Sequence, residues 1–340
     1  MAKRLISIQN LKKYYPLPKT SLFGKRPVLR ANDGVSMEIN EGEVYGLVGE
    51  SGCGKSTFGR AVLQLDRPTD GEAVYYGRGT PIRLTECKGA TLRGLRRDLQ
   101  IVFQDPYSSL NPRMRVGQII EEGVATHGYF KRGSAAMREY ILATMKKCGL
   151  QGYMAERYPH QFSGGQRQRV GIARALAVRP RFVVCDECVS ALDVSIQSQI
   201  LNLLTKLKKE EGLTYLFISH DLSVVRYISD RIGVMYLGKI VEEGKAEEVF
   251  SNPLHPYTIA LISAVPSMEE DGRKKILLSG STQSPLSASQ GCPFASRCFM
   301  AEEVCRRIPT PLEEVETGRF CACHFARLPL EEKQKRAFEK

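Results

Sequence analysis

Gly49-Glu50-Ser51-Gly52-Cys53-Gly54-Lys55-Ser56-Thr57 is a complete GxxxxGK[ST] pattern that follows the apolar run Val44–Val48 and precedes a helix-compatible segment. Glycines let the backbone curl until its N–H groups converge on phosphate oxygens, and the helix N-terminus adds its dipole. In such a loop Lys55 reaches the β and γ phosphates, and Ser56 supplies an oxygen to Mg²⁺. The strand and helix on either side favour a phosphate-binding loop over an ordinary glycine-rich turn.

Two adjacent carboxylates follow a second apolar run. Asp186 and Glu187 come directly after residues 182–185, which read as a buried strand. A carboxylate at the end of a strand can hold Mg²⁺ through water, and its neighbour can polarise an attacking water molecule. Paired acids in this position also cap helices. The phosphate loop in the same chain favours the metal and water roles for Asp186 and Glu187.

A further glycine-containing segment, Ser163-Gly164-Gly165-Gln166, precedes the helical stretch Val170–Val178. Serine and glycine at a helix start offer N–H groups and the positive end of a dipole to an anion. Taken alone, Ser-Gly-Gly is more often a flexible turn. A chain that already has one phosphate loop needs a second phosphate-binding terminus only if that terminus serves the nucleotide of another subunit.

Hydrophobic periodicity predicts an α/β organisation. Short strands are expected in the first 90 residues, including 35–39 and 44–48, and again at 182–184 and 213–219. Helices are expected from Ser134 to Gly149 and over the segment that carries Ile196 to Leu207 and ends near Gly212. Alternation of strand and helix predicts a parallel sheet. The texture changes to Pro, Ser and Cys beyond Phe250, so a domain boundary is placed near residue 250.

Composition sets the class of protein. The chain has 340 residues, 42% hydrophobic and 25% charged, which is enough for one large core and a smaller appendage. The longest apolar stretches are far shorter than the roughly 18 residues that cross a bilayer, and no signal-peptide core follows Met1, so a cytoplasmic location is expected. The net charge is +12, and eight basic residues without an acidic one fall in the first thirty. This bias fits an anionic neighbour or simply a solvated basic face.

These motifs, in this order and spacing, resemble the ATP-binding subunits of ABC transporters. The resemblance implies a P-loop NTPase fold: an ABC ATPase domain over residues 1–250 with a RecA-like core, an N-terminal antiparallel β subdomain and a helical signature subdomain at about 105–180. It also implies specific roles. Those are the Walker A loop (Gly49, Ser51, Gly52, Gly54, Lys55, Ser56, Thr57), the Q-loop (Gln104), the signature (Ser163, Gly164, Gly165, Gln166), the Walker B pair (Asp186, Glu187), the D-loop (Ser190 to Asp193), the switch histidine (His220) and an adenine-stacking ring (Tyr15).

The match is narrower than the superfamily. The segments 103–112, 158–162 and above all Asn252-Pro253-Leu254-His255-Pro256-Tyr257-Thr258 resemble the oligopeptide/dipeptide importer branch. That branch implies a heterodimer with a second homologous ATPase, two transmembrane permease subunits, an extracytoplasmic solute-binding protein, and a peripheral place on the cytoplasmic face of the membrane. It also contains importers of nickel and other small solutes. This chain departs from the branch in having Cys188 where proline usually follows the Walker B glutamate, and in beginning the signature with Phe162 rather than leucine.

The resemblance implies MgATP hydrolysis between two subunits. His220 is expected to sense the γ-phosphate and Glu187 to direct water at it, while Lys55 and Mg²⁺, held by Ser56, Gln104 and Asp186, neutralise developing charge. Gln104 is expected to couple the metal site to the loop that faces the permease. The Ser163 segment would then contact the nucleotide of the partner subunit.

Five of the ten cysteines lie within 32 residues near the C-terminus, in the part of the chain (251–340) expected to form a small extension. Their spacing resembles the extension of the same branch, where Cys292, Cys298, Cys305 and Cys323 match recurring positions. Four converging thiolates can hold a [4Fe-4S] cluster or a structural zinc ion, and His324 gives zinc one more option. The alternative is a set of free thiols that pack a small domain.

Two other functions compete with transport. A non-transport ABC ATPase acting on nucleic acid is conceivable because the N-terminal stretch is basic, but such proteins usually carry two cassettes or a long coiled coil, so no nucleic acid is expected. A regulatory subunit that binds without hydrolysing is disfavoured because Glu187 and His220 are both present.

Overall fold

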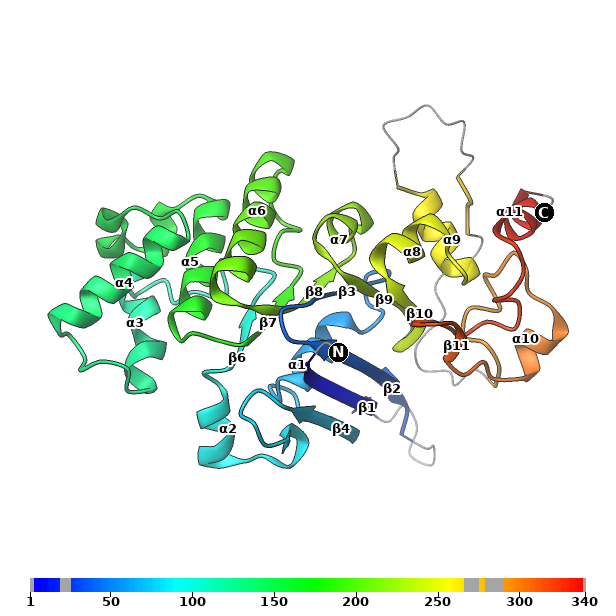
Figure 1. Ribbon diagram of the computed structural model, residues 1–340, viewed down its shortest axis with the longest axis horizontal. Coiled ribbons are helices and arrows are strands. Elements are labelled where there is room, and N and C mark those ends of the chain that lie inside the picture. The colour runs from blue at the N-terminus through cyan, green and yellow to red at the C-terminus, as the bar shows by residue number, and fades with distance from the viewer. Residues whose placement is uncertain (1–2, 19–25, 266–274, 279–289, 339–340) are drawn as a thin grey trace. The chain divides into compact units, whose positions relative to one another are not determined.

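The structure is a computed structural model that describes residues 3–18, 26–265, 275–278 and 290–338 (Figure 1). The chain divides into two compact units. Unit 1 comprises Met1–Ile6, Ile39–Val44 and Val74–Ile218, and unit 2 comprises Ser7–Glu38, Tyr45–Ala73 and Ser219–Lys340. Lys19 and Lys25, part of the basic N-terminal stretch, lie outside the described residues.

Unit 1 contains three parallel strands. The strand β7 (Phe182–Asp186) pairs with β6 (Leu99–Val102) on one side and with β8 (Thr214–Ser219) on the other. Every residue of β7 and β8 is buried, as expected for strands covered on both faces and visible in the sequence as continuous apolar runs. Asp186, opposite Ile218, therefore lies at the carboxyl end of the sheet, where α/β proteins place their ligands.

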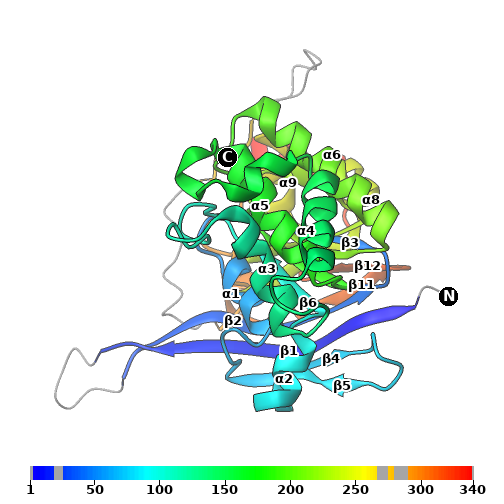
Figure 2. The same cartoon turned by 90° about the vertical axis from the view of Figure 1, so that its left-hand side faces the viewer.

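Helices make up most of the rest of unit 1. Figure 2 looks onto α3 (Val116–Thr126), α4 (Ala135–Lys147) and α5 (Gly164–Ala177), which pack against one another. The predicted helix after Ser134 is confirmed, because the Ser134 hydroxyl accepts a hydrogen bond from the Met137 N–H, and the helix that ends near Gly212 is confirmed by a left-handed cap at φ 66°. The elements are α2 (Gly89–Leu95), α3 (Val116–Thr126), α4 (Ala135–Lys147), α5 (Gly164–Ala177) and α6 (Val194–Glu211), the short 3₁₀ turns Leu84–Glu86, Gly152–Glu156 and Pro159–Gln161, and the strand β5 (Ile82–Arg83).

Unit 2 is built on a second parallel pair. The strand β3 (Val44–Val48) runs parallel to β9 (Arg231–Tyr236), and α1 (Lys55–Val62) follows β3 after the phosphate loop. The strands β1 (Arg4–Pro16) and β2 (Val28–Asn40) have 13 residues each, so the short strands expected here are longer than predicted. The strand β4 (Asp70–Tyr75) lies next to β1 in the sheet, and its residues Val74 and Tyr75 pair antiparallel with β5.

Residues beyond 250 contain more regular structure than their weak periodicity indicates. The strand β12 (Arg319–Cys321) pairs antiparallel with β10 (Lys239–Lys245) and with β11 (Glu313–Glu316). A strand of three residues is too short to show a period, and only its pairing with β10 defines it. The other helices of unit 2 are α7 (Leu222–Ile228), α8 (Ala246–Ser251), α9 (Pro256–Ser263), α10 (Glu303–Arg307) and α11 (Leu330–Phe338). The domain boundary near residue 250 stays a prediction.

Candidate nucleotide site

The phosphate loop, Gly49–Thr57, curls around the side chain of Lys55. The Lys55 Nζ is buried and donates to the backbone oxygens of Gly49, at 2.7 Å, and Glu50, at 3.0 Å. Two glycines are needed for this path, because a Cβ on Gly49 would lie 2.2 Å from the Met235 carbonyl oxygen and one on Gly54 would lie 2.0 Å from the Ala31 oxygen. The loop backbone thus surrounds the Lys55 ammonium group at the start of α1.

The first turn of α1 gathers other predicted residues. Gly54, at φ 107°, caps the helix, and the Asn32 Nδ2 donates to the Gly54 oxygen at 3.0 Å. The Tyr15 side chain hydrogen-bonds with Thr57, and burial raises the pKa of its hydroxyl. The Lys13 Nζ lies 4.8 Å from the centre of the Tyr15 ring. The structure therefore brings Tyr15 to the phosphate loop, while its stacking on adenine stays a prediction.

Two predicted site residues in unit 1 contact each other directly. The Gln104 Nε2 donates to the Glu187 Oε2 at 2.8 Å. Asp186 is 1% exposed at the end of β7, and Glu187 follows in a left-handed conformation, φ 46°, with its N–H bound to the Ile218 oxygen at 3.0 Å. The turn directs the chain away from the strand and leaves the Glu187 carboxylate fixed by Gln104.

Cys188, which stands where the resemblance implies proline, is buried. Its side chain is 1% exposed, and its thiol hydrogen-bonds with that of Cys185, an interaction that together with burial raises the pKa of Cys185. The Ser190 hydroxyl donates to the Glu187 oxygen at 2.9 Å. Packing and hydrogen bonds therefore hold this turn in the absence of a proline ring.

The signature segment, Ser163–Gln166, is a reciprocal capping box. The Ser163 Oγ accepts from the Gln166 N–H at 3.3 Å, and the Gln166 Oε1 accepts from the Ser163 N–H at 3.0 Å. A Cβ on Gly165 would lie 2.3 Å from the Cγ2 of Ile196 in α6, so only glycine permits this approach of the two helices. Ser163 itself is exposed at the N-terminus of α5, where the positive end of the helix dipole lies.

Side chains from α5 hold the glutamine loop, Phe103–Ser109, and sequence reasoning missed them. The Arg167 guanidinium lies 3.7 Å from the centre of the Tyr107 ring. The Gln168 Nε2 donates to the Phe103 oxygen at 3.5 Å, and the Arg174 Nη1 donates to the Ser109 oxygen at 2.6 Å. Arg167 and Arg174 are seven residues apart and so share one helix face, which was the available signal. The signature helix and the glutamine loop are thereby joined within unit 1.

The two remaining predicted residues stand at other helix starts. The Asp193 Oδ1 accepts from the Ile196 N–H at 3.0 Å, and this backbone hydrogen bond lowers the pKa of Asp193. His220 is exposed directly after β8, and Asp221 caps α7. Lys55 and His220 belong to unit 2, whereas Gln104, Glu187, Asp193 and the signature segment belong to unit 1.

The clustered cysteines influence one another electrostatically. Burial raises the pKa of Cys298 to about 12 and that of Cys323 to about 11, and neighbouring thiols contribute to both shifts. Backbone N–H groups of Met300 and Phe325 point at the Cys298 and Cys323 sulfurs, at 3.3 and 3.4 Å. Over the described ranges, no three His, Cys, Asp or Glu side chains form a group that could hold a metal ion. None of the ten cysteines, all of which lie in the described ranges, forms a disulfide bond.

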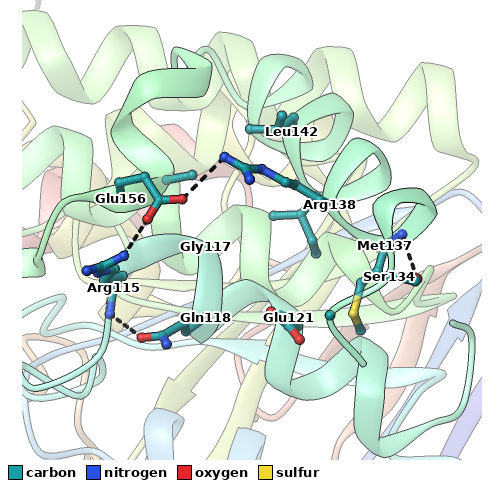
Figure 3. A pocket seen from close by; sticks show the side chains of 12 residues that line it. Arg115, Gly117, Gln118, Glu121, Ser134, Met137, Arg138, Leu142 and Glu156 are labelled. Atoms are coloured by element: carbon teal, nitrogen blue, oxygen red, sulfur yellow. Dashed lines mark hydrogen bonds and ion pairs between the residues drawn. The ribbon is translucent and has the colours of Figure 1, made fainter. Parts of the chain in front are cut away.

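A pocket of about 280 Å³ lies among α3, α4 and the Gly152–Glu156 turn (Figure 3). The Glu156 carboxylate joins Arg115, at 2.6 Å, and Arg138, at 3.6 Å, across it. The nucleotide-site residues predicted from the sequence are not among its lining residues. Within the described part of the chain, no helix is both long and apolar enough to cross a membrane.

Comparison with known proteins gives the family. The ABC transporter family model matches residues 32–190, and the model of the oligopeptide/dipeptide transporter C-terminal region matches 241–305. The putative oligopeptide transport ATP-binding protein YkfD of Bacillus subtilis is 47% identical, with 95% of this chain and 96% of that protein covered. The dipeptide transport ATP-binding protein DppF of Haemophilus influenzae is 48% identical, with 94% and 96% covered.

Solved structures agree on the fold. The dimeric structure of MJ0796, a bacterial ABC transporter cassette, is 31% identical and superposes with a TM-score of 0.62 over 71% of this chain and 99% of that chain. The residues that the ABC transporter family model matches, 32–190, include the phosphate loop, the paired carboxylates and the signature segment. The chain belongs to the family of ATP-binding subunits of ABC transporters.

Proposed function

We propose that this chain binds and hydrolyses MgATP as the energising subunit of an ABC importer of dipeptides or oligopeptides. The relatives are named as oligopeptide or dipeptide transport ATP-binding proteins and match nearly the whole chain, which supports peptides over nickel and transport over nucleic-acid work. The match of residues 241–305 to the oligopeptide/dipeptide C-terminal family supports the same substrate class.

The observation that carries hydrolysis, rather than binding alone, is the contact between Gln104 and Glu187. A carboxylate held in one orientation by an amide can align a water molecule and accept its proton. In the proposed reaction Lys55 binds the β and γ phosphates, Glu187 orients the attacking water and His220 contacts the γ-phosphate. Mg²⁺, when held by Ser56, Gln104 and Asp186, supplies neutralisation of the phosphate charge.

The signature segment leads to the proposed assembly. Its exposed Ser163 would bind the nucleotide of a second, homologous ATPase, and Asp193 would lie beside the same interface. Two permease subunits fed by an extracytoplasmic binding protein would complete the importer, with this chain at the cytoplasmic face of the membrane. Copurification with polytopic membrane proteins tests the assembly, whereas copurification with DNA or ribosomes would favour the nucleic-acid function.

Replacement of Glu187 by Gln tests the chemistry. The amide keeps the volume and a hydrogen bond to Gln104 but cannot accept a proton, so ATP turnover should fall by about 10²–10⁴-fold while ATP stays bound. Turnover is measured by phosphate release and binding by nucleotide retention. Asp105→Asn, which changes an exposed acid next to Gln104, serves as the charge-matched control. Hydrolysis by Glu187→Gln at the wild-type rate would refute the assignment.

We further propose that Cys292, Cys298, Cys305 and Cys323 bind a [4Fe-4S] cluster or, alternatively, zinc. Support comes from the proximity of these thiols, which raise the pKa of one another, and from the N–H groups aimed at two of the sulfurs, which favour the thiolate form that a metal binds. The thiols would have to move closer together to bind a metal. Anaerobic purification followed by metal analysis and absorption spectroscopy tests this. We expect the wild-type chain and Cys87→Ser to contain metal and Cys298→Ser to lack it. A metal-free wild-type chain would refute the proposed metal site.

A further inference from the structure

Residues of the C-terminal extension (251–340) contact the phosphate loop at Glu50. The Glu50 carboxylate accepts two hydrogen bonds from the Arg297 guanidinium, at 2.9 and 3.1 Å. The Glu50 N–H donates to the Tyr257 hydroxyl at 2.9 Å. The Arg297 side chain is 9% exposed and that of Glu50 25% exposed, so this is a shielded, bidentate ion pair rather than a mobile surface contact.

Tyr257 is itself fixed by a buried network. The Glu242 carboxylate, on β10, accepts from the N–H groups of Leu254 and His255, both at 2.8 Å, and the His255 Nδ1 accepts from the Tyr257 N–H at 3.1 Å. The Lys333 Nζ, on α11, donates to the Leu254 oxygen at 2.9 Å. The segment Asn252–Thr258, which indicated the transporter branch in the sequence, thus has a physical role, because it holds the Tyr257 hydroxyl in place.

Aromatic packing places Arg297 on the same support. The ring of Phe294, three residues before Arg297, lies 5.3 Å from the rings of both Tyr236 and Tyr257. Tyr236 and Tyr257 are 4.7 Å apart, edge to face. One buried aromatic cluster therefore positions both the Arg297 guanidinium and the Tyr257 hydroxyl. Removal of either polar group should change the contacts of Glu50 while the aromatic rings stay packed.

Glu50 matters because of its place in the loop. Its carbonyl oxygen accepts from the Lys55 Nζ at 3.0 Å, so the position of Glu50 helps to set the position of the cation that binds the phosphates. Its N–H is committed to Tyr257, and its carbonyl oxygen also accepts from the Cys53 N–H at 3.3 Å, so contacts on both sides hold this residue at the start of the loop. Pre-organisation of a binding loop raises affinity because less ordering is needed on binding.

We infer that Arg297 and Tyr257 are positioning residues for the phosphate loop, through which the C-terminal extension sets the affinity for MgATP. Neither residue contacts the phosphates in this inference, and both act through Glu50. The inference rests on the proposed function, because it assumes that the loop binds ATP.

Binding of MgATP to the purified full-length chain tests the inference. Arg297→Gln should raise the dissociation constant about tenfold, since a coupling contact of this kind typically changes binding by about twofold to thirtyfold. Arg297→Lys should recover part of the loss because it restores the charge. Tyr257→Phe, which removes only the hydroxyl, should weaken binding about threefold and serves as the second variant should Arg297→Gln fold poorly. Arg307→Gln, which removes an exposed arginine paired with Glu303 in the same extension, should leave binding unchanged.

A double-mutant cycle separates positioning from general destabilisation. If Arg297 acts through Glu50, the Glu50→Gln and Arg297→Gln changes should not multiply, and the double variant should bind within about twofold of Arg297→Gln alone. Wild-type affinity in Arg297→Gln and Tyr257→Phe, or fully multiplicative effects in the cycle, would overturn the inference while leaving the proposed function intact. A wild-type chain that does not bind MgATP would overturn the proposed function and this inference with it.

Discussion

The phosphate loop and the signature segment are both glycine-containing helix starts, yet they are held in different ways. The signature segment is closed by hydrogen bonds between residues three apart, Ser163 and Gln166. The phosphate loop leans on side chains more than 200 positions away, Tyr257 and Arg297. One helix start is therefore held by local hydrogen bonds, and the other depends on the fold of the C-terminal extension.

The largest effect on the phosphate loop is expected from Gly49→Ala. The new Cβ would meet the Met235 carbonyl oxygen, which is backbone and cannot move aside, so the loop must shift at a cost of about 3 kcal/mol or more and ATP binding should be lost. Thermal unfolding and nucleotide binding measure the two effects.

Gly52→Ala is the matched control for stability. Gly52 also has a positive φ, 80°, but no heavy atom of the described chain lies within 4 Å of a Cβ built there, so only backbone strain of about 1 kcal/mol is expected. Equal stability losses in the two variants would show that the Met235 carbonyl oxygen does not constrain the backbone of the loop.

A second test lowers the pH to weaken the hydrogen-bond network, through His255, that holds Tyr257. Burial, with nearby Lys333, lowers the pKa of His255 to about 3 from its ordinary 6.5. Below pH 6.5 the unfolded chain gains a proton that folded His255 cannot hold, so the free energy of unfolding falls by ~1.4 kcal/mol per pH unit, and this group adds no pH dependence above pH 6.5. At pH 5 the loss should reach about 2 kcal/mol.

His255→Asn should remove that slope, because the asparagine oxygen can replace Nδ1 as acceptor for the Tyr257 N–H but does not titrate. Denaturant unfolding between pH 5 and 7.5 measures the slope in both proteins, with His160→Asn, at an exposed position, as the control. An identical slope in the wild type and His255→Asn would mean that His255 does not carry the acid sensitivity.

The smallest expected effect lies at the signature segment. Ser163→Ala removes a helix cap and should cost about 1 kcal/mol of unfolding free energy, while Ser163→Thr, which keeps the acceptor oxygen, should cost less. MgATP affinity of the single chain should stay within about twofold of wild type, because the phosphate loop belongs to the other unit. A larger change in affinity would contradict the local character assigned to this segment.

The same contrast explains what the sequence could predict. Capping and periodicity are local, so the helices after Ser134 and Asp193 and the buried strands at 182–186 and 214–219 were predictable. The phosphate loop was predictable because its glycine pattern is dictated by backbone geometry. The contacts of Glu50 with Arg297 and Tyr257, and the pairing of Glu242 with Cys321 in the sheet, join distant segments and leave no local pattern. For the same reason the contact of Gln104 with Glu187 was not predicted, although each residue was assigned a role.

The separation of Arg297 from Glu50 along the chain also has a consequence for biosynthesis. The guanidinium that grips the loop is made 247 residues after the carboxylate, which at ~5–20 residues per second is a delay of roughly 12–50 s. During that time the nascent chain has its glycine loop but not its outer support. Ribosome-bound chains truncated before Arg297 should therefore bind ATP more weakly than chains that include α11, so that nucleotide binding matures only after the C-terminal extension has been made.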